Sequence, residues 1–600
     1  RRTTLASYRT ASPKWEVLLD LDVLATKEKE NWVWKGSSCL PAKDHLCLIY
    51  LSRGGKDAIV TREYDFNAKA FVEGGFSLPE SKGYSVWYDE NSLLASTNFG
   101  PNSMTDSGYP RQVRKLTRGQ KLADAEIILE GAKADMMAWA STTVTPAGKF
   151  AVVGIRKTFY SSEMFLWQEK QKPIRLDVPH DAEALEIFQD QQLFLLRSDW
   201  KTNAHTFRGG QLISLSLKNL NEPPSLVYAP AEDVFIQQVA TTSEAVFMTV
   251  LEKVKGRVLR ITRNSSGSWS SSIVEGTGPG QPYFSSSDPE GKLLILRHEG
   301  FLSPTSQWML DSQRQNATFE KIKSLPTRFQ AKNGKVEQFE AVSKDGTRVP
   351  YFVISSEPLR MDGKNPTVLY GYGGFEVSVT PYYIAGIGKT WLERTKGVYV
   401  VANIRGGGEF GPEWHAAARG VKRQKAFDDF IAVAEDLIRR QITSPAHLGI
   451  LGGSNGGLLV GAVTMQRPEL FGAVVCQVPL LDMIRYTKLL AGDSWKDEYG
   501  DPENSEVREA ILKYSPYQNA RHDVAYPEIF FMTSTKDDRV HPGHARKMAA
   551  KLLDYKKPVL FYENIEGGHG AAANLEQRIR FNAYAFTFFK EKLAPETKAR

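Results

Sequence analysis

A glycine-rich stretch in the second half of the chain carries a single serine. In GILGGSNGGLLVG (residues 449–461), the residues Gly452, Gly453, Ser454, Asn455 and Gly456 fit the pattern G-x-S-x-G. Small neighbours allow the backbone to hold such a serine on a sharp strand-to-helix turn, where its hydroxyl is exposed as a nucleophile. A glycine-rich turn with an incidental serine has the same five-residue pattern, so the residues that could activate the serine decide between the two interpretations.

The chain supplies a base and an acid in the order that a serine hydrolase requires. A serine hydroxyl is a weak nucleophile at neutral pH and needs a base, usually a histidine that a carboxylate orients. In α/β-hydrolases these residues follow one another as Ser, Asp or Glu, then His. Downstream of Ser454, the apolar run EIFFMTST leads into Asp537 and Asp538, and PVLFYENIEGG leads to His569 in GGHGAA. The spacing does not choose between the two adjacent acids.

Two further groups could stabilise the oxyanion of a tetrahedral intermediate. The backbone N–H of Asn455, next to the serine, is the expected first donor. The second donor should come from an early strand loop, where LYGYGGF offers Tyr372 between glycines. The nearby GGGEFG fits G-x-G-x-x-G, but Pro412 follows it and no acidic strand end lies about 20 residues on, so we interpret it as a tight turn and not as a nucleotide site.

The second half of the chain must position these residues. The runs VPYFVISS, PTVLYGYGG, GVYVVANIRGGG, HLGILGGS, AVVCQVP, EIFFMTSTKDD and PVLFYENIEGG are typical of strands. Helical patterns such as KAFDDFIAVAEDLIRRQ and HARKMAAKLLDYKK separate most of them. This alternation predicts an α/β-hydrolase domain with a doubly wound, mostly parallel sheet over residues 326–600. Reactive groups gather beyond the carboxyl ends of such strands, and the serine turn follows one of them.

The first half has a different pattern, which predicts an all-β domain over residues 1–325. The apolar runs LCLIYLS, LLASTNF, FAVVGI, LFLLR, AVFMTVL and LLILR recur between Gly-, Asp-, Asn- and Pro-containing turns. A repeat of roughly 40–60 residues with about four strands per unit indicates a β-propeller. Six intervals and the opening piece KWEVLLDLDVL lead us to expect seven blades, the first of which the chain need not complete. An irregular array of β-sandwiches is the alternative.

Composition excludes several classes of protein. Charged residues make up 24% of the chain and hydrophobic residues 42%, which is typical of globular proteins. The net charge of +7 is spread along the sequence with no basic run interleaved with aromatic residues, so we expect no nucleic-acid partner. No apolar run approaches the length of a membrane span. We therefore expect no membrane partner, and we also expect a monomer.

The few histidines and cysteines give no sign of a metal or cofactor. His541 and His544 in HPGH are spaced as a metal pair could be, but no cysteine or further histidine cluster joins them, so we expect neither a metal nor a cofactor. The three cysteines contain no C-x-x-C pair, which indicates neither a disulfide framework nor a zinc site and suits a reducing compartment. The opening RRTTLASYRT has no apolar stretch of a signal peptide. We expect a cytoplasmic protein, or a periplasmic or secreted one if an upstream segment was removed.

From about Asp345 to Leu593 the chain resembles the prolyl oligopeptidase (prolyl endopeptidase) family of serine peptidases. The motifs that carry this resemblance are LYGYGGFEVSVTPYY, VVANIRGGGEFGPEWH, FDDFIAVAEDLI, TSPAHLGILGGSNGGLLVGAVTMQRPELFGAVVCQVP, DSWKDEYGDP, KYSPYQNA, KDDRVHPGHA and GGHGAA. The first half is similar to the family's propeller in architecture and rough length. The resemblance also implies an N-terminal segment that packs on the hydrolase domain, and we expect the printed chain to lack it.

The resemblance assigns a role to each candidate residue. It implies that Ser454 is the nucleophile, His569 the base and Asp537 the orienting carboxylate, and that the Tyr372 hydroxyl is the second oxyanion donor. Arg539 matches the arginine that holds a substrate carbonyl next to the cleaved residue. The remaining matches form the pocket for the substrate proline: Trp495, whose ring stacks on it, with Phe375 and Tyr499 as further walls.

The resemblance and these residues together predict a serine endopeptidase that cleaves short peptides after proline. Proline is an apolar ring without an N–H, which suits an uncharged aromatic slot, whereas a pocket for Arg or Lys needs carboxylates. Two alternatives stay open. One is an oligopeptidase of different specificity, of the basic-residue or acylaminoacyl type. The other is a propeller-based binding protein with a vestigial hydrolase domain.

Overall fold

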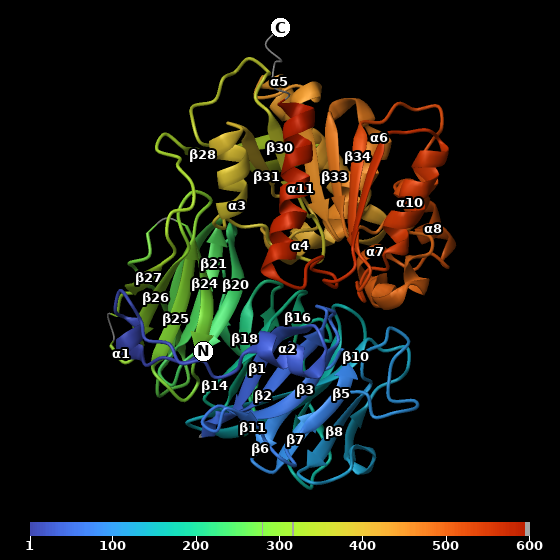
Figure 1. Cartoon of the computed structure of the whole chain (residues 1–600). Coiled ribbons are helices and arrows are strands. Elements are labelled where there is room, and N and C mark those ends of the chain that lie inside the picture. Colours follow the sequence, from blue (N-terminus) through green and yellow to red (C-terminus); the bar gives the residue numbers. More distant parts are fainter. Residues whose placement is uncertain (42, 204, 279, 315–316, 595–600) are drawn as a thin grey trace.

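Two domains follow one another along the chain (Figure 1). The computed structural model describes residues 1–594 except for residues 42, 204, 279 and 315–316. The first domain consists of antiparallel sheets, and the second is built on one mixed sheet. The last strand of the first domain, β27 (Glu320–Ser324), and the first strand of the second, β28 (Lys335–Val342), flank the expected boundary at residue 325.

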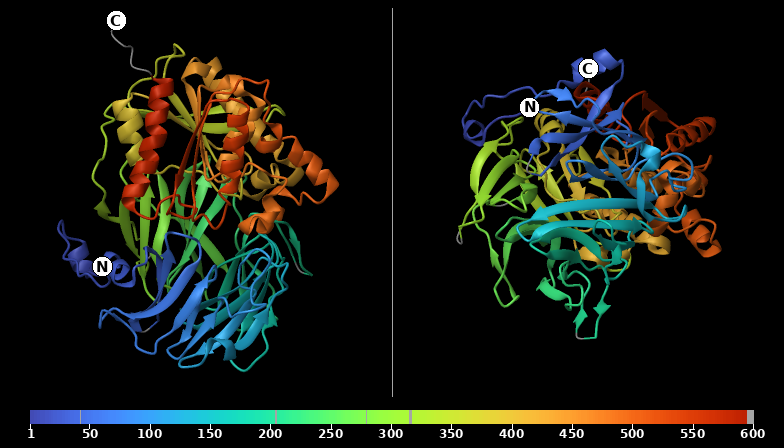
Figure 2. Two further views of the ribbon diagram at one scale, coloured as in Figure 1. Left: turned by 45° about the vertical axis from the view of Figure 1, so that its right-hand side comes forward. Right: turned by 90° about the horizontal axis from the view of Figure 1, so that it is seen from below.

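Within the described residues, the first domain is a β-propeller of six blades, each an antiparallel sheet of four or five strands. The right-hand view of Figure 2 shows these sheets arranged around a common axis. The first three blades are β1 (Trp32–Leu40), β2 (Lys43–Arg53), β3 (Ile59–Asp65), β4 (Ala70–Phe71) and β5 (Ser77–Ser81); β6 (Val86–Asp89), β7 (Ser92–Ala95), β8 (Gln112–Thr117) and β9 (Glu126–Glu130); and β10 (Met137–Thr145), β11 (Gly148–Arg156), β12 (Ser162–Trp167) and β13 (Ile174–Arg175).

The other three blades follow in the same way, with one short two-stranded ribbon, β16 (Trp200–Lys201) and β17 (Thr206–Phe207), inserted in the fourth. They are β14 (Glu183–Phe188), β15 (Gln191–Leu195), β18 (Leu212–Ser216) and β19 (Ser225–Tyr228); β20 (Val234–Thr241), β21 (Val246–Glu252), β22 (Lys255–Arg263) and β23 (Trp269–Ile273); and β24 (Gln281–Ser287), β25 (Leu293–Glu299), β26 (Ser306–Asp311) and β27.

The apolar runs that predicted the propeller occupy the same place in every blade. Each of the six falls on the second strand of its sheet, that is on β2, β7, β11, β15, β21 or β25. Most residues of each of these strands are buried between neighbouring sheets, and β7 is buried along its whole length, although Leu293 and Arg297 of β25 are exposed. A strand with two covered faces is apolar throughout, which is why these six runs stand out in the sequence.

The expected number of seven blades is wrong. The opening piece KWEVLLDLDVL forms no blade: its described structure is an extended segment that ends in helix α2 (Leu21–Glu28). Asp20 caps this helix by accepting hydrogen bonds from Asp22 and Val23. Leu19 and Leu21 of the piece pack against the first blade and Leu24 joins its core, whereas Trp15, Val17 and Val23 are exposed. That blade is itself a complete sheet of five strands.

A disulfide joins Cys39 and Cys47 in the first blade. The antiparallel register of β1 and β2 places these two residues directly opposite each other. Their spacing along the chain is eight residues, and the expectation that the cysteines form no bridge is therefore wrong at this pair. The third cysteine, Cys476, is free and buried in the second domain.

The second domain contains an eight-stranded sheet in the order β28-β29-β31-β30-β32-β33-β34-β35. The strands after β28 are β29 (Arg348–Ser355), β30 (Thr367–Gly371), β31 (Val398–Ala402), β32 (Leu448–Gly453), β33 (Ala473–Gln477), β34 (Glu528–Ser534) and β35 (Val559–Asn564). β29 pairs antiparallel with β28 and β31, and all the following pairs are parallel. All seven predicted strands are present, and β28 is an additional strand at one edge.

Helices cover both faces of this sheet. The main ones are α5 (Gln424–Arg439), α6 (Asn455–Gln466) and α10 (Gly543–Asp554) on one face, and α11 (Leu575–Leu593) on the other (Figures 1 and 2). The predicted helices correspond to α5 and α10. The shorter helices are α1 (Leu5–Tyr8), α3 (Ala385–Ile387), α4 (Gly411–Ala416), α7 (Lys496–Tyr499), α8 (Ser505–Leu512) and α9 (Pro516–Asn519).

The buried stripe of α5 shows how the sequence fixes this packing. Phe427, Phe430, Val433 and Leu437 recur at helical spacing and are fully buried against the sheet. On the opposite face, Phe589 of α11 packs with Trp391. The rigid layer between the two cores is the parallel part of the sheet, and it fixes the loops that follow its strands.

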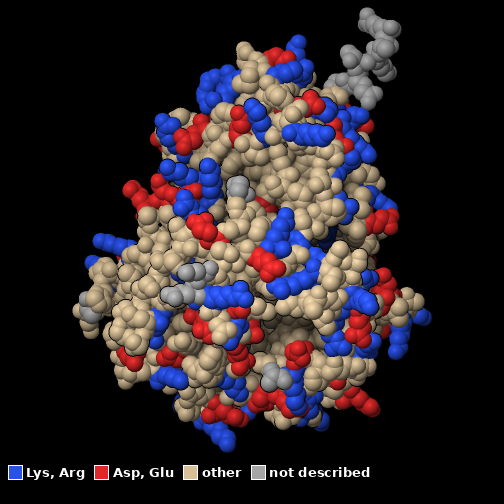
Figure 3. All heavy atoms as spheres, turned by 90° about the vertical axis from the view of Figure 1, so that its left-hand side faces the viewer, with Lys and Arg blue, Asp and Glu red and all other residues tan. Residues whose placement is uncertain are grey.

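The surface carries both signs of charge. Figure 3 shows Lys and Arg interspersed with Asp and Glu on one face of the molecule, with no extended patch of a single sign. None of the helices described in the structure is both long and apolar enough to traverse a membrane.

Candidate active site

The turn between β32 and α6 holds Ser454 in a strained conformation. Its φ of 59° and ψ of −119° are unusual for a residue with a side chain, and such strain persists only where the surroundings hold it. The Ser454 N–H donates to the carbonyl of Gln477 on the neighbouring strand (2.9 Å). Only glycine fits at Gly452, because a Cβ there would lie 2.1 Å from the Gly456 oxygen. The glycines of the motif therefore permit the close strand-to-helix approach that presents the serine.

Three side chains converge at this turn from three loops at the carboxyl ends of strands. The Nε2 atom of His569 lies 3.0 Å from the Ser454 hydroxyl, and its Nδ1 lies 2.8 Å from the Oδ2 atom of Asp537. The other oxygen of Asp537 accepts the N–H groups of Arg539 (3.0 Å) and Val540 (2.9 Å). A carboxylate only accepts hydrogen bonds, so Nδ1 carries the proton and Nε2 is free to accept one from the serine.

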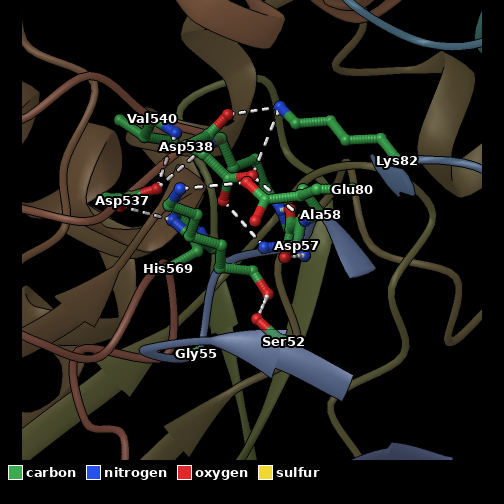
Figure 4. Close-up of polar contacts among 12 residues, drawn as sticks. Ser52, Gly55, Asp57, Ala58, Glu80, Lys82, Asp537, Asp538, Val540 and His569 are labelled. Atoms are coloured by element: carbon green, nitrogen blue, oxygen red, sulfur yellow. Dashed lines mark hydrogen bonds and ion pairs between the residues drawn. The ribbon is translucent and has the colours of Figure 1, made fainter. Parts of the chain in front are cut away.

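The second acid of the pair has a different partner. The carboxylate of Asp538 accepts the main-chain N–H groups of Asp57 (2.8 Å) and Ala58 (3.1 Å), which lie in the β2–β3 loop of the propeller. Lys82 of the propeller lies beside the same carboxylate, with its Nζ 3.8 Å from Oδ2 (Figure 4). The structure thus separates the two candidates that the spacing could not: Asp537 contacts His569, and Asp538 contacts the other domain.

The two expected oxyanion donors both lie next to the serine. Asn455 begins α6, and the first N–H groups of a helix have no partner within it. Tyr372 is partly buried, and this desolvation raises the pKa of its phenol, although its hydrogen bond with Ser454 opposes that effect. The hydroxyl is therefore protonated at neutral pH and can donate. The Asn455 side chain links the two donors, because its Nδ2 donates to the carbonyl of Tyr372 (2.6 Å).

A cavity of about 530 Å³ opens beside the serine, between the two domains. Its aromatic part, which we call the aromatic pocket, is formed by Trp495 and Phe375 next to Ser454. The two rings meet edge to face with centroids 6.5 Å apart. Tyr499 is fully buried behind Phe375 (5.6 Å between centroids) and not on the cavity surface. Its hydroxyl donates to the Asn455 side chain (2.8 Å), so it supports the pocket from behind.

Arg539 lies at the rim of this cavity and is already engaged. Its Nε and Nη2 atoms contact the Asp57 carboxylate at 2.6 and 2.9 Å. Burial disfavours the charged guanidinium, but the hydrogen bonds and charge of Asp57 outweigh it and raise the pKa of Arg539. The arginine expected to hold a substrate carbonyl therefore forms a contact between the domains in this structure.

The two histidines of HPGH do not face each other as ligands. Buried His544 accepts main-chain N–H groups from Leu481 (3.2 Å) and Asp482 (3.1 Å) through Nδ1. His541 accepts the Gly543 N–H through its own Nδ1 (2.9 Å). Among the described residues there is no group of three or more His, Cys, Asp or Glu side chains placed to hold a metal.

Sequence reasoning missed the part of the site that the propeller provides. The propeller residues that line the cavity are Lys35, Asp57, Lys82, Tyr84, Tyr109 and Phe159. All of them except Lys35, which lies within β1, are in loops, and all are more than 290 residues before Ser454 along the chain. No local motif marks them, because their common position depends on how the two domains meet.

Comparisons with known proteins agree with this geometry. The family model described as prolyl oligopeptidase family matches residues 388–596, and the model of the prolyl oligopeptidase N-terminal beta-propeller domain matches residues 1–322. An uncharacterized peptidase of Sinorhizobium fredii is 42% identical, over 99% of this chain and 83% of the relative. A prolyl endopeptidase of Elizabethkingia miricola is 29% identical, over 97% of this chain and 81% of the relative.

A solved structure has the same architecture almost throughout. The structure of a post-proline cleaving enzyme from Rickettsia typhi is 34% identical, with a TM-score of 0.95 over 99% of this chain and 88% of its own. The two family models together match most of both domains. In the structure, Ser454, His569 and Asp537 lie within hydrogen-bonding distance of one another in the order serine, histidine, aspartate. The chain therefore belongs to the prolyl oligopeptidase family and is a serine peptidase of that type.

Proposed function

We propose that this peptidase hydrolyses short peptides on the carboxyl side of proline. The observation that carries the proposal is the aromatic pocket beside Ser454, whose walls are Trp495 and Phe375. An apolar ring without an N–H leaves no unpaired donor in such a pocket and packs on aromatic faces. The names of the relatives from Elizabethkingia and Rickettsia support the same specificity.

The proposed reaction passes through an acyl-enzyme. The Ser454 hydroxyl attacks the carbonyl carbon of the proline residue while His569 Nε2 takes its proton, and Asp537 holds the imidazole in orientation. The negative oxygen of the tetrahedral intermediate accepts hydrogen bonds from the Asn455 N–H and the Tyr372 hydroxyl. His569 then gives its proton to the leaving amine. A water molecule, activated by the same histidine, releases the proline-ended product.

A pocket for a basic residue is a weaker interpretation. Two carboxylates lie near the pocket, but each is paired: Asp57 with Arg539, and buried Glu498 with Arg423 (2.7 Å). An arginine or lysine substrate would have to displace one of these cations, which costs free energy. This pairing favours an uncharged residue before the cleaved bond.

We also propose that the propeller restricts substrates to short peptides. It covers the cavity and contributes six of the residues that line it. A peptide then reaches Ser454 when the two domains part, a step of the kind that limits turnover in many enzymes. The proposed scheme uses only side chains, main-chain N–H groups and water, with the protein acting as a monomer.

A panel of chromogenic peptides with Pro, Ala or Arg before the cleaved bond tests the specificity. We expect kcat/KM to be highest for Pro. A preference for Arg would indicate a basic-residue oligopeptidase, and release of only acylated N-terminal residues an acylaminoacyl type. Failure to react with a fluorophosphonate, with Ser454→Ala as the unreactive control, would indicate a vestigial site.

A further inference from the structure

A buried polar cluster lies directly behind the aromatic pocket. At its centre is Glu498 of α7, which is fully buried. One oxygen, Oε1, accepts the main-chain N–H of Phe375 (3.0 Å) and a bond from Arg423 (2.7 Å). The other, Oε2, lies 2.7 Å from Nε2 of His415. Burial by itself would raise the pKa of Glu498, but the hydrogen bond of His415 and the charge of Arg423 bring it to about 2.

This carboxylate holds the wall of the pocket in an unfavourable backbone conformation. Phe375 and the following Glu376 both have a φ of +56°, in the left-handed region that side chains disfavour. Such a turn persists only where other contacts fix it. The bond from the Phe375 N–H to Glu498 is one of these contacts, so the placement of the Phe375 ring depends on where Glu498 lies.

The last partner of Glu498 comes from the other domain. Tyr160, in the propeller loop between β11 and β12, donates its hydroxyl to Oε2 at 2.6 Å. The main-chain N–H of the same residue donates to Asp497 (3.3 Å). Its ring packs on His415 (4.8 Å between centroids). The preceding residue, Phe159, meets the Phe375 ring edge to face at 5.1 Å. The loop therefore touches both Phe375 and the carboxylate that holds it.

We propose that Tyr160 is a positioning residue for the aromatic pocket, which it completes only when the propeller lies on the hydrolase domain. Its hydroxyl fixes Glu498, and Glu498 fixes the main chain of Phe375. This inference rests on the proposed function, because it concerns the pocket that receives proline. When the domains part, Glu498 loses this bond and Phe375 loses its contact with Phe159, so the wall is released. Closure then both encloses the peptide and forms the pocket.

The test compares two tyrosine-to-phenylalanine variants. Tyr160→Phe removes the hydroxyl and keeps the ring. Tyr283→Phe is the matched control, because the Tyr283 hydroxyl of the propeller also contacts the hydrolase domain, at Thr380, but is no part of the cluster around Glu498. Each variant is assayed with peptides carrying Pro or Ala before the cleaved bond, and the rate of fluorophosphonate labelling of Ser454 is measured in parallel.

We expect Tyr160→Phe to lower kcat/KM for the Pro peptide roughly five- to twentyfold, mainly through KM, because it removes a hydrogen bond to a charged group. The labelling rate should change less than twofold, since the probe does not need the pocket. Inhibition by a peptide that ends in proline should weaken by a similar factor. Tyr283→Phe should leave all three quantities within twofold of the unchanged protein.

Other outcomes distinguish failure of the inference about Tyr160 from failure of the proposed cleavage after proline. Equal effects of the two variants would mean that Tyr160 only helps to hold the domains together, and would overturn the inference. A fall in labelling as large as the fall in turnover would place the effect at the nucleophile and would also overturn it. If the unchanged protein does not prefer proline, the proposed function fails, whatever the variants do.

Discussion

Asp57 of the propeller and Arg539 of the hydrolase domain form a two-bond ion pair at the rim of the catalytic cavity, with contacts of 2.6 and 2.9 Å. The arginine is two residues from Asp537 in the chain, so a contact between the domains lies next to the catalytic acid. A substrate carbonyl that binds Arg539 must share the guanidinium with Asp57 or displace it. Binding of substrate and contact between the domains therefore compete for one side chain.

Asp57→Asn should make the site more accessible. Both side chains are partly exposed, so the pair contributes at most about 1 kcal/mol to closure. We expect labelling of Ser454 by a bulky fluorophosphonate to become up to about fivefold faster, and its dependence on salt concentration to become weaker. Asp523→Asn, which breaks the exposed pair of Asp523 with Arg521, is the control and should change neither. Slower labelling would contradict this account of the pair.

Ser454→Ala should abolish turnover while the fold is kept. Loss of a serine nucleophile lowers kcat by at least about a thousandfold. Alanine and serine both carry a Cβ, so the strained backbone conformation at this position costs the same free energy in both proteins. The midpoint of thermal unfolding should therefore shift by less than about 2 °C. Activity assays and calorimetry on the same sample check both points. Residual turnover near that of the unchanged protein would remove Ser454 from the reaction.

The two adjacent aspartates should behave differently. Asp537→Asn should lower kcat by about 10⁴, because an amide can hold His569 in the wrong tautomer. Asp538→Asn leaves the triad intact and removes a charge that binds the propeller loop, so its effect should fall on KM and stay within about tenfold. Steady-state measurement of kcat and KM for both variants with the same Pro peptide tests this difference. Similar losses of kcat in both variants would contradict the assignment.

Trp495→Ala should reduce cleavage after proline more than cleavage after alanine. The ring forms one wall of the aromatic pocket, and loss of such a wall costs about 1–3 kcal/mol for a substrate that packs on it. We expect kcat/KM to fall roughly ten- to hundredfold for the Pro peptide and only a few-fold for the Ala peptide. Equal losses would show that Trp495 supports the fold and does not choose the substrate.

His544 should make the protein sensitive to acid. Burial lowers the pKa of this histidine from 6.5 to about 4, so its neutral form is favoured in the folded state. The unfolded chain then binds more protons between these values, so the stabilisation is complete above pH 6.5 and is lost as the pH falls towards 4. Its full extent is about 3 kcal/mol.

Urea unfolding at a series of pH values measures this effect. His544→Gln should reduce the loss of stability between pH 6.5 and 4, even though the variant is less stable at neutral pH. His522→Gln, at an exposed histidine, is the matched control and should leave the slope unchanged. A slope that is the same in all three proteins would show that His544 titrates normally.

The sequence was sufficient where local pattern and structure coincide. The six apolar runs mark the second strand of each blade, since a strand covered on both faces is apolar throughout. The strands of the hydrolase domain are local in the same sense, whereas only the family resemblance pointed to Asp537 and not to the adjacent Asp538. The prediction of a seventh blade rests on KWEVLLDLDVL, in which apolar and polar residues alternate as they do in a strand. In the structure the end of this segment forms α2 and packs on the first blade.

Contacts between distant loops could not be predicted in this way. Nothing near Asp57 or Tyr160 in the chain indicates that these residues meet Arg539 and Glu498. Cys39 and Cys47 meet because of the register of two strands, and a search for C-x-x-C does not detect such a pair. Tyr499 was expected on the pocket wall, but it lies one layer deeper, because Phe375 occupies the surface in front of it.

The position of Asp538 has a consequence for any attempt to produce the hydrolase domain by itself. Removal of the propeller would take away both main-chain donors of this carboxylate and leave a free negative charge one residue from Asp537. Arg539 would lose Asp57 in the same step, so two neighbouring charged residues of the catalytic loop would lose the contacts that hold them. The smallest active piece of this enzyme should therefore include the first propeller blade, with the loop that carries Asp57 and Ala58.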